Sequence, residues 1–190
     1  MSKLIFTYGT MGSAKTVHSL IKYFELERQG KKVLLMKSST DTRDGIGVFK
    51  RRVGLERKGI SFDDNESLRE IVLKHKGIQF VVVDEAQFLK TNHVNELKYL
   101  AVYNNITVYV FGLKTNFMSE LFEGTKRLME LADETRTLDM TCMLCDNPAE
   151  INARFDSKGK IIKEGAVVDI GGNEKYKALC YKCWNDEIIK

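Results

Sequence analysis

The stretch GTMGSAKT, residues 9–16, constrains the fold of this chain more than any other. It follows a short apolar run rich in β-forming residues, KLIFTY at 3–8, which predicts a strand. It precedes residues 15–29, where apolar side chains recur at helical spacing. A strand, a glycine-containing turn and a helix in this order are typical of a loop that binds phosphate. The usual pattern there is G-x-x-x-x-G-K-[ST], and this chain carries Ala14 in place of the second glycine.

Such a loop holds a nucleotide through backbone N–H groups that converge on the phosphates at a helix N-terminus. Lys15 is expected to reach the β- and γ-oxygens, and Thr16 to offer its hydroxyl to Mg²⁺. Ala14 is expected to crowd the loop or to take a positive φ, at a cost of about 1–2 kcal/mol that a bound ligand can offset. The alternative is a chance match in a surface turn. The predicted ATP and phosphate contacts are Gly9, Thr10, Met11, Gly12, Ser13, Ala14, Lys15 and Thr16.

Strands and helices alternate over the first 140 residues. Further strands are predicted at 31–37, 79–85 and 106–112, and further helices at 92–103 and from a start at Asp63, Asp64 or Asn65 toward His75. Apolar strands separated by helices imply an α/β domain, residues 1–139, with a parallel sheet that helices cover on both faces. The polar, glycine-containing segment 41–59 is expected to be a mobile loop.

Two carboxylates follow a nearly all-apolar strand in the sequence VVVDEAQF, residues 81–88. Ligands bind at the carboxyl ends of parallel strands, so these groups are expected beside the phosphate loop. Asp84 is then placed to hold Mg²⁺ through water, and Glu85 is the candidate general base. Gln87 of the same motif is counted among the ATP contacts. The alternative is a pair of solvated acids at a helix start, where carboxylates are favourable.

Four cysteines form two C-x-x-C pairs near the C-terminus, namely Cys142 with Cys145 and Cys180 with Cys183. Together they can close a tetrahedral, structural Zn²⁺ site with no open coordination position. Unligated thiols or a redox pair are the alternative. The alternation of predicted strands and helices ends at about residue 138 and is followed by short β-like runs at 149–155 and 159–165. Residues 140–190 are therefore predicted to form a small zinc module.

Composition excludes few functional classes. With 43% hydrophobic residues the 190-residue chain can bury one main core and a small module. Its formal net charge of +4 is interspersed, which is weak evidence for nucleic-acid binding. The sequence has neither a signal-peptide pattern nor a membrane-spanning apolar run, so a cytoplasmic protein is expected.

Taken together, these motifs resemble the cytosolic, zinc-containing thymidine kinases that bacteria and animals share. GTMGSAKT is similar to the P-loop of that family, VDEAQF to its Walker-B and catalytic motif, and the cysteine pairs to its zinc ligands. KSSTDTR at 37–43 resembles the segment that carries an active-site arginine, and DIGGNEKY at 169–176 resembles the lasso that folds over the nucleoside. The resemblance implies a P-loop NTPase fold of the RecA-like type, with a lasso loop in the zinc module.

The resemblance also implies roles for individual residues. Glu85 would take the proton of the thymidine 5′-hydroxyl, and Arg43 would position that oxygen and the phosphoryl group. Nucleoside contacts would come from Met11, Leu113, Phe117, Phe122, Ile170, Gly171, Gly172 and Tyr176. Without the resemblance, Phe117 and Phe122 read more readily as core residues of the following helix. The chain departs from the family pattern at Ala14, Lys114, Met118 and Leu121.

The leading hypothesis is therefore a kinase that transfers the γ-phosphoryl group of ATP to thymidine with Mg²⁺. The alternatives are a nucleic-acid-dependent ATPase, which DEAQ favours, and a catalytically degenerate nucleotide-binding relative, which Ala14 and the 114–121 segment favour. The resemblance further implies a homo-oligomer, tetramer or dimer, and admits feedback by dTTP. Neither a membrane nor a nucleic acid is an expected partner.

Overall fold

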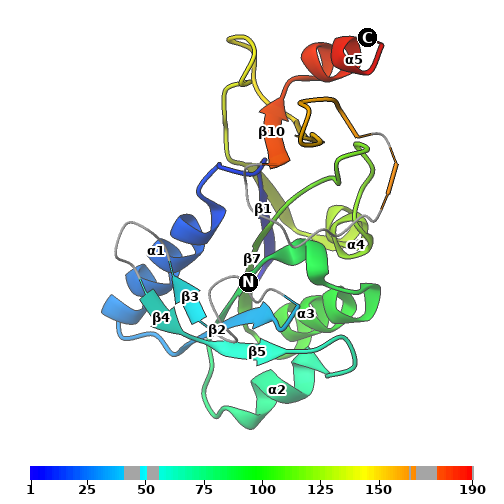
Figure 1. The fold of residues 1–190 in the computed structure, drawn as a ribbon. Helices are drawn as coiled ribbons and strands as arrows, with labels where there is room; N and C mark the ends of the chain where they lie inside the picture. The colour runs from blue at the N-terminus through cyan, green and yellow to red at the C-terminus, as the bar shows by residue number, and fades with distance from the viewer. Residues whose placement is uncertain (41–47, 51–55, 163, 166–174, 190) are drawn as a thin grey trace.

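A computed structural model describes residues 1–40, 48–50, 56–162, 164–165 and 175–189 (Figure 1). Its regular elements follow one another in this order: β1 (Leu4–Tyr8), α1 (Lys15–Arg28), β2 (Val33–Ser38), β3 (Val48–Lys50), β4 (Glu56–Lys58), β5 (Ile60–Phe62), α2 (Leu68–Lys74), β6 (Phe80–Asp84), the 3-10 turn η1 (Ala86–Phe88), α3 (Thr91–Tyr103), β7 (Thr107–Gly112), α4 (Glu123–Leu131), β8 (Glu134–Thr137), β9 (Ile151–Arg154), β10 (Tyr176–Leu179) and α5 (Tyr181–Ile189). Within the described ranges, no helix combines the length and the hydropathy that a bilayer-spanning segment needs.

Six parallel strands form the main sheet, in the order β5-β2-β6-β7-β1-β8. The predicted strands correspond to β1, β2, β6 and β7, which are the four central ones. Sequence reasoning missed the two outer strands, β5 and β8. Both are short and polar or half-buried, so their sequences lack the apolar run that marked the central strands.

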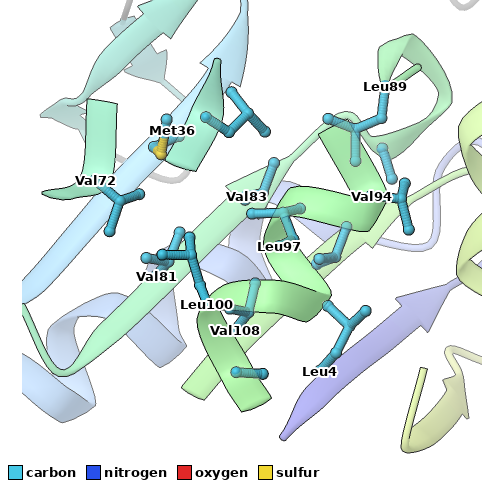
Figure 2. Packing of buried hydrophobic residues seen from close by; sticks show 14 of the residues in the cluster. Leu4, Met36, Val72, Val81, Val83, Leu89, Val94, Leu97, Leu100 and Val108 are labelled. Atoms are coloured by element: carbon cyan, nitrogen blue, oxygen red, sulfur yellow. The ribbon is translucent and has the colours of Figure 1, made fainter. Parts of the chain in front are cut away.

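Helices cover both faces of this sheet, as predicted. On one face α1 packs Leu20 and Tyr23 against Leu35, Val82 and Phe111. On the opposite face α2, α3 and α4 close over the larger cluster (Figure 1). Figure 2 shows part of that cluster. Most of its members lie on β1, β2, β6, β7 and the three helices, and they include Leu4, Met36, Val72, Val81, Val83, Leu97, Leu100 and Val108. Alternate residues of β6 serve the two faces because successive strand side chains point in opposite directions.

The predicted start of α2 is wrong. Asp63 accepts a hydrogen bond from the backbone of Asn65 in a turn, and the helix begins only at Leu68. Its N-cap is Ser67, whose hydroxyl accepts a hydrogen bond from the backbone N–H of Glu70. Several consecutive residues here could cap a helix, so local pattern alone did not choose among them.

The C-terminal part holds a small antiparallel pair, β9 with β10, and helix α5. The run at 149–155 contains β9, as predicted. The run at 159–165 forms no strand in its described residues; Ile161 makes one isolated bridge to Phe155. The predicted loop at 41–59 contains the short antiparallel pair β3 with β4 at its described residues.

Candidate active site

The residues predicted to bind a nucleotide gather at one edge of the sheet. The phosphate loop follows β1, Glu85 follows β6, and Leu113 follows β7. These strands are parallel, so their carboxyl ends meet at the same edge. The loop and the carboxylates are not on adjacent strands, because β7 lies between β1 and β6. The segment after β7, residues 113–122, therefore lies between the phosphate loop and the carboxylates.

The departure at Ala14 has a direct structural consequence. Ala14 takes φ 58° and ψ 28°, the left-handed conformation, immediately before the first residue of α1. Left-handed backbone suits glycine, whereas a residue with a Cβ pays about 1–2 kcal/mol for it. Gly12 also has a positive φ, 89°. The loop thus keeps the glycine-like conformation at residue 14 although the glycine is gone.

Lys15 lies across the mouth of the loop. Its Nζ donates to the carbonyl oxygen of Thr10 at 2.6 Å and lies 3.4 Å from Ser13 Oγ. Ser13 Oγ donates to the same Thr10 carbonyl at 2.8 Å. These bonds hold the ammonium group against Thr10 and Ser13 of the loop that leads into α1, and an anion is favoured at such a helix N-terminus. Thr16, with its side-chain hydroxyl, is buried in the first turn.

The two carboxylates are buried rather than solvated. Asp84 is 2% exposed and Glu85 is 8% exposed, which rules out a pair of solvated helix-capping acids. Asp84 Oδ1 accepts a hydrogen bond from the backbone N–H of Glu85 at 3.0 Å. Glu85 has a left-handed backbone, φ 58° and ψ 49°. Such strain in a non-glycine residue persists only where the surrounding structure holds it, and it is typical of functional sites.

Gln87 holds the Glu85 carboxylate in place. Its Nε2 donates to Glu85 Oε2, and its Oε1 accepts from the backbone N–H of Leu113 at 3.1 Å. The turn η1 approaches β7 closely: a Cβ on Gly112 would lie 2.5 Å from the Ala86 Cβ. Sequence reasoning placed Gln87 among the ATP contacts and missed this bridge, which depends on a contact between η1 and the residue after β7.

The segment after β7 forms a compact turn that is anchored to its surroundings. Thr125 donates its hydroxyl to the Leu113 carbonyl at 2.9 Å. Asn116 Oδ1 accepts from the backbone of Met118 and of Glu120, at 2.9 and 3.0 Å. These bonds give the turn a fixed shape.

Phe117 is 2% exposed but precedes α4, so it is not a residue of the following helix. Phe122 occupies the N-cap position of α4 and is half-buried. Lys114 Nζ lies 5.5 Å from the centre of the Tyr8 ring, and the other two departures, Met118 and Leu121, lie in the turn itself. The guanidinium of Arg154 lies over the Phe117 ring at 5.2 Å, a contact from a different strand pair.

Other predicted residues are placed only in part. Arg43, Ile170, Gly171 and Gly172 lie outside the described residues. Tyr176 is described: it opens β10 and pairs with Arg154 of β9. Asn152, also on β9, was not predicted, yet it accepts a hydrogen bond from the backbone N–H of Met11 at 2.6 Å. No local sequence signal marks this contact, since the two residues are 141 positions apart.

The four cysteines form one cluster, as predicted. The sulfurs of Cys142, Cys145, Cys180 and Cys183 all lie within 4.8 Å of one another. Cys145 Sγ is 3.6 Å from both Cys180 Sγ and Cys183 Sγ, so the cysteines are not disulfide-bonded. A tetrahedral ion with Zn–S bonds of about 2.3 Å requires sulfurs about 3.8 Å apart, so the cluster fits a metal of that size.

The thiols also perturb one another. Burial alone would raise the pKa of Cys142, but hydrogen bonds from the backbone of Cys180 and Leu144 outweigh it and lower that pKa to about 6. Hydrogen bonds with Cys145 and then Cys180 raise the pKa of Cys183 to about 12. Four thiolates this close need a cation to neutralise them, and a bound metal would deprotonate the coordinating thiols.

Comparison with known proteins agrees with these features. The family model described as "TK: Thymidine kinase" matches residues 2–184. A thymidine kinase from Streptococcus gordonii is 39% identical and covers 96% of this chain and 95% of its own. A second, from Lactiplantibacillus plantarum, is 40% identical over 95% of this chain and 94% of its own. Among solved structures, a Pif1 helicase from Candida albicans has a TM-score of 0.44 and 16% sequence identity. The match covers 72% of this chain and 36% of the helicase.

Proposed function

The chain belongs to the thymidine kinase family, and on that premise we propose which of its residues transfer the γ-phosphoryl group of ATP to the 5′-hydroxyl of thymidine. The observation that carries the assignment of roles is a buried, strained Glu85 at the sheet edge that also holds the phosphate loop. A nucleic-acid-dependent ATPase is not favoured, because the family match and the named relatives extend over nearly the whole chain.

We propose that the phosphate loop binds ATP. Backbone N–H groups of the loop and of the start of α1 would bind the phosphates, and Lys15 would neutralise the β- and γ-oxygens. The hydroxyl of Thr16 and the carboxylate of Asp84 are hard oxygen donors that would hold Mg²⁺, with Asp84 acting through water. When bound, Mg²⁺ neutralises charge that develops on the phosphate oxygens.

Glu85 is proposed to act as the general base. Its carboxylate accepts the proton of the thymidine 5′-hydroxyl while that oxygen forms a bond to the γ-phosphorus and the bond to ADP breaks. The hydrogen bond from Gln87 keeps the carboxylate in one orientation, which is the main requirement when catalysis depends on positioning. Arg43 is proposed to position the hydroxyl oxygen and the phosphoryl group.

Thymidine is proposed to bind between the phosphate loop and the segment after β7. The contacts are Met11, Leu113, Phe117, Phe122 and Tyr176, with the backbone of Ile170, Gly171 and Gly172 closing over the sugar and base. The burial of Phe117 and the pairing of Tyr176 with Arg154, which itself covers Phe117, support this grouping. A lid of this kind excludes water and so limits wasteful hydrolysis of ATP.

Zn²⁺ is proposed as the ion of the cysteine cluster, in a structural role. All four ligands would come from cysteines, which leaves no open position for a substrate. We further propose the division into residues 1–139 and 140–190, a cytoplasmic location, a tetramer or dimer, and feedback by dTTP.

The test is ADP release by the purified protein with Mg²⁺ and ATP, with thymidine, each other deoxynucleoside or single-stranded DNA as the added component. We expect release with thymidine and formation of thymidine monophosphate. Release stimulated by DNA alone would contradict the proposal, as would ATP binding without turnover on any addition.

A further inference from the structure

One side chain of the cysteine-containing module reaches the phosphate loop. Asn152 is 3% exposed and lies in the middle of β9. Its Oδ1 accepts a hydrogen bond from the backbone N–H of Met11 at 2.6 Å, and its Nδ2 lies 3.4 Å from the carbonyl oxygen of Thr115, to which it donates. A single amide thus joins the phosphate loop, the segment after β7, and β9.

The bond to Met11 acts on the same peptide unit that anchors Lys15. That unit contains the carbonyl of Thr10 and the N–H of Met11, and the described part of the chain contains no cis peptide bond. In a planar trans peptide the two groups point in opposite directions, so fixing one fixes the other. Asn152 holds the N–H end, and Lys15 Nζ donates to the carbonyl end at 2.6 Å.

One face of strand β9 packs on the cysteine-containing core, and the other faces the phosphate loop and the segment after β7. Ala153 and the half-buried Cys145 belong to the module's own core. The flanking residues, Asn152 and Arg154, point to the opposite side because strand side chains alternate. Arg154 covers the Phe117 ring from that side. Formation of the module therefore places both side chains against the segments that surround the substrates.

We propose that Asn152 is a positioning residue for thymidine phosphorylation, an inference that rests on the proposed function. Through Met11 it orients the peptide that anchors Lys15, and through Thr115 it holds the nucleoside-binding segment. It touches neither reacting atom. A buried N–H that loses its acceptor is costly, so the loop is expected to rearrange when Asn152 is shortened.

Two substitutions separate the two hydrogen bonds. Asn152→Ala removes both, and we expect kcat to fall about tenfold and the KM for thymidine to rise about tenfold; each change corresponds to about 1.4 kcal/mol. Asn152→Asp keeps an acceptor for Met11 N–H but turns an oxygen toward the Thr115 carbonyl. It should recover most of kcat while the KM for thymidine stays high.

The control is Glu150→Ala, an exposed position two residues earlier, which should match the wild type. Zinc content and thermal melting are measured on every variant, and the dissociation constants of thymidine and of Mg²⁺ with ADP are measured by calorimetry. A positioning role predicts unchanged zinc content and separate responses of kcat and KM. Loss of zinc or of melting temperature that parallels loss of activity in both Asn152 variants would instead show a merely structural role and overturn the inference.

The remaining outcomes are also decisive. If Asn152→Ala keeps kcat and KM within about twofold of the wild type, the inference is wrong while the proposed function stands. If the wild type does not phosphorylate thymidine, the proposed function fails. The calorimetry then tests only whether Asn152 positions the phosphate loop. If Asn152→Ala binds Mg²⁺ with ADP as tightly as the wild type, this positioning is overturned. If it binds more weakly and Asn152→Asp restores the affinity, this positioning is supported.

Discussion

Gln87 donates a hydrogen bond from its side-chain amide to the carboxylate of Glu85. Its Oε1 accepts from the backbone N–H of Leu113, the residue that directly follows β7, and this bond fixes the orientation of the amide. The proposed base is therefore held by a neighbour two residues away, and that neighbour is held by the residue that follows β7. Rotation of the Glu85 carboxylate away from the proposed position of the thymidine 5′-hydroxyl would break its hydrogen bond with Gln87.

Removing the proposed base should abolish most turnover but spare binding. Glu85→Gln keeps the size of the side chain and loses the proton acceptor, so we expect kcat to fall about 100-fold or more. Thymidine and ATP affinities, measured by calorimetry, should change little. Glu70→Gln, at an exposed position of α2, is the matched control. Full activity of Glu85→Gln would show that another group accepts the proton.

Shortening Gln87 should act on kcat through the orientation of Glu85. We expect Gln87→Ala to lower kcat about tenfold, because the carboxylate loses the donor that orients it. Steady-state kinetics with thymidine and ATP measure the effect, and Gln79→Ala, at an exposed glutamine, serves as the control. A loss of ATP affinity with unchanged kcat would instead assign Gln87 to ATP binding, the role predicted from sequence.

Restoring the glycine of the phosphate loop should be neutral or favourable. The φ of 58° at Ala14 is unfavourable for a residue with a Cβ, whereas glycine adopts that conformation without strain. We expect Ala14→Gly to bind ATP within tenfold of the wild type or more tightly, and Ala14→Val to bind more weakly because a branched Cβ fits the left-handed region poorly. Calorimetric titration with ATP measures both. A large loss of affinity in Ala14→Gly would mean that the alanine methyl group has a role of its own.

Loss of one sulfur should remove the metal and loosen the module. Cys180→Ser replaces a buried ligand, so we expect less than one zinc per chain by metal analysis and a lower melting temperature. Lys182→Ser, an exposed substitution between the ligands Cys180 and Cys183, should keep both values. Unchanged zinc content and melting of Cys180→Ser would contradict a structural metal site.

Acid should weaken the contacts that Asp133, just after α4, makes with Lys98 of α3 and Leu4 of β1. A hydrogen bond from Lys98, with help from the backbone N–H of Leu4, lowers the pKa of Asp133 below its ordinary 3.8. A depressed folded-state pKa stabilises the protein above the unfolded value, and that contribution is lost as the pH falls through the folded value. The melting temperature of Asp133→Asn should therefore be lower than that of the wild type near neutral pH, and the gap should narrow below pH 3.8. A gap that does not depend on pH would rule out the charge as its cause.

The sequence by itself determined the elements whose signals are local. Central strands such as β6 are continuous apolar runs, the phosphate loop is one contiguous motif, and each C-x-x-C pair is a fixed spacing. Family membership followed from several such motifs in order. It could be inferred without tertiary structure because each motif has a chemical requirement that few residue types meet.

Only the tertiary structure decided how these parts cooperate. The start of α2 at Leu68, the orientation of Glu85 by Gln87, and the link from Asn152 to Met11 all depend on which of several equivalent groups finds a partner in space. The last of these joins residues 141 positions apart. Side-chain amides hydrogen-bond equally well to many partners, so their pairing is chosen by the packing of the whole molecule rather than by neighbouring sequence.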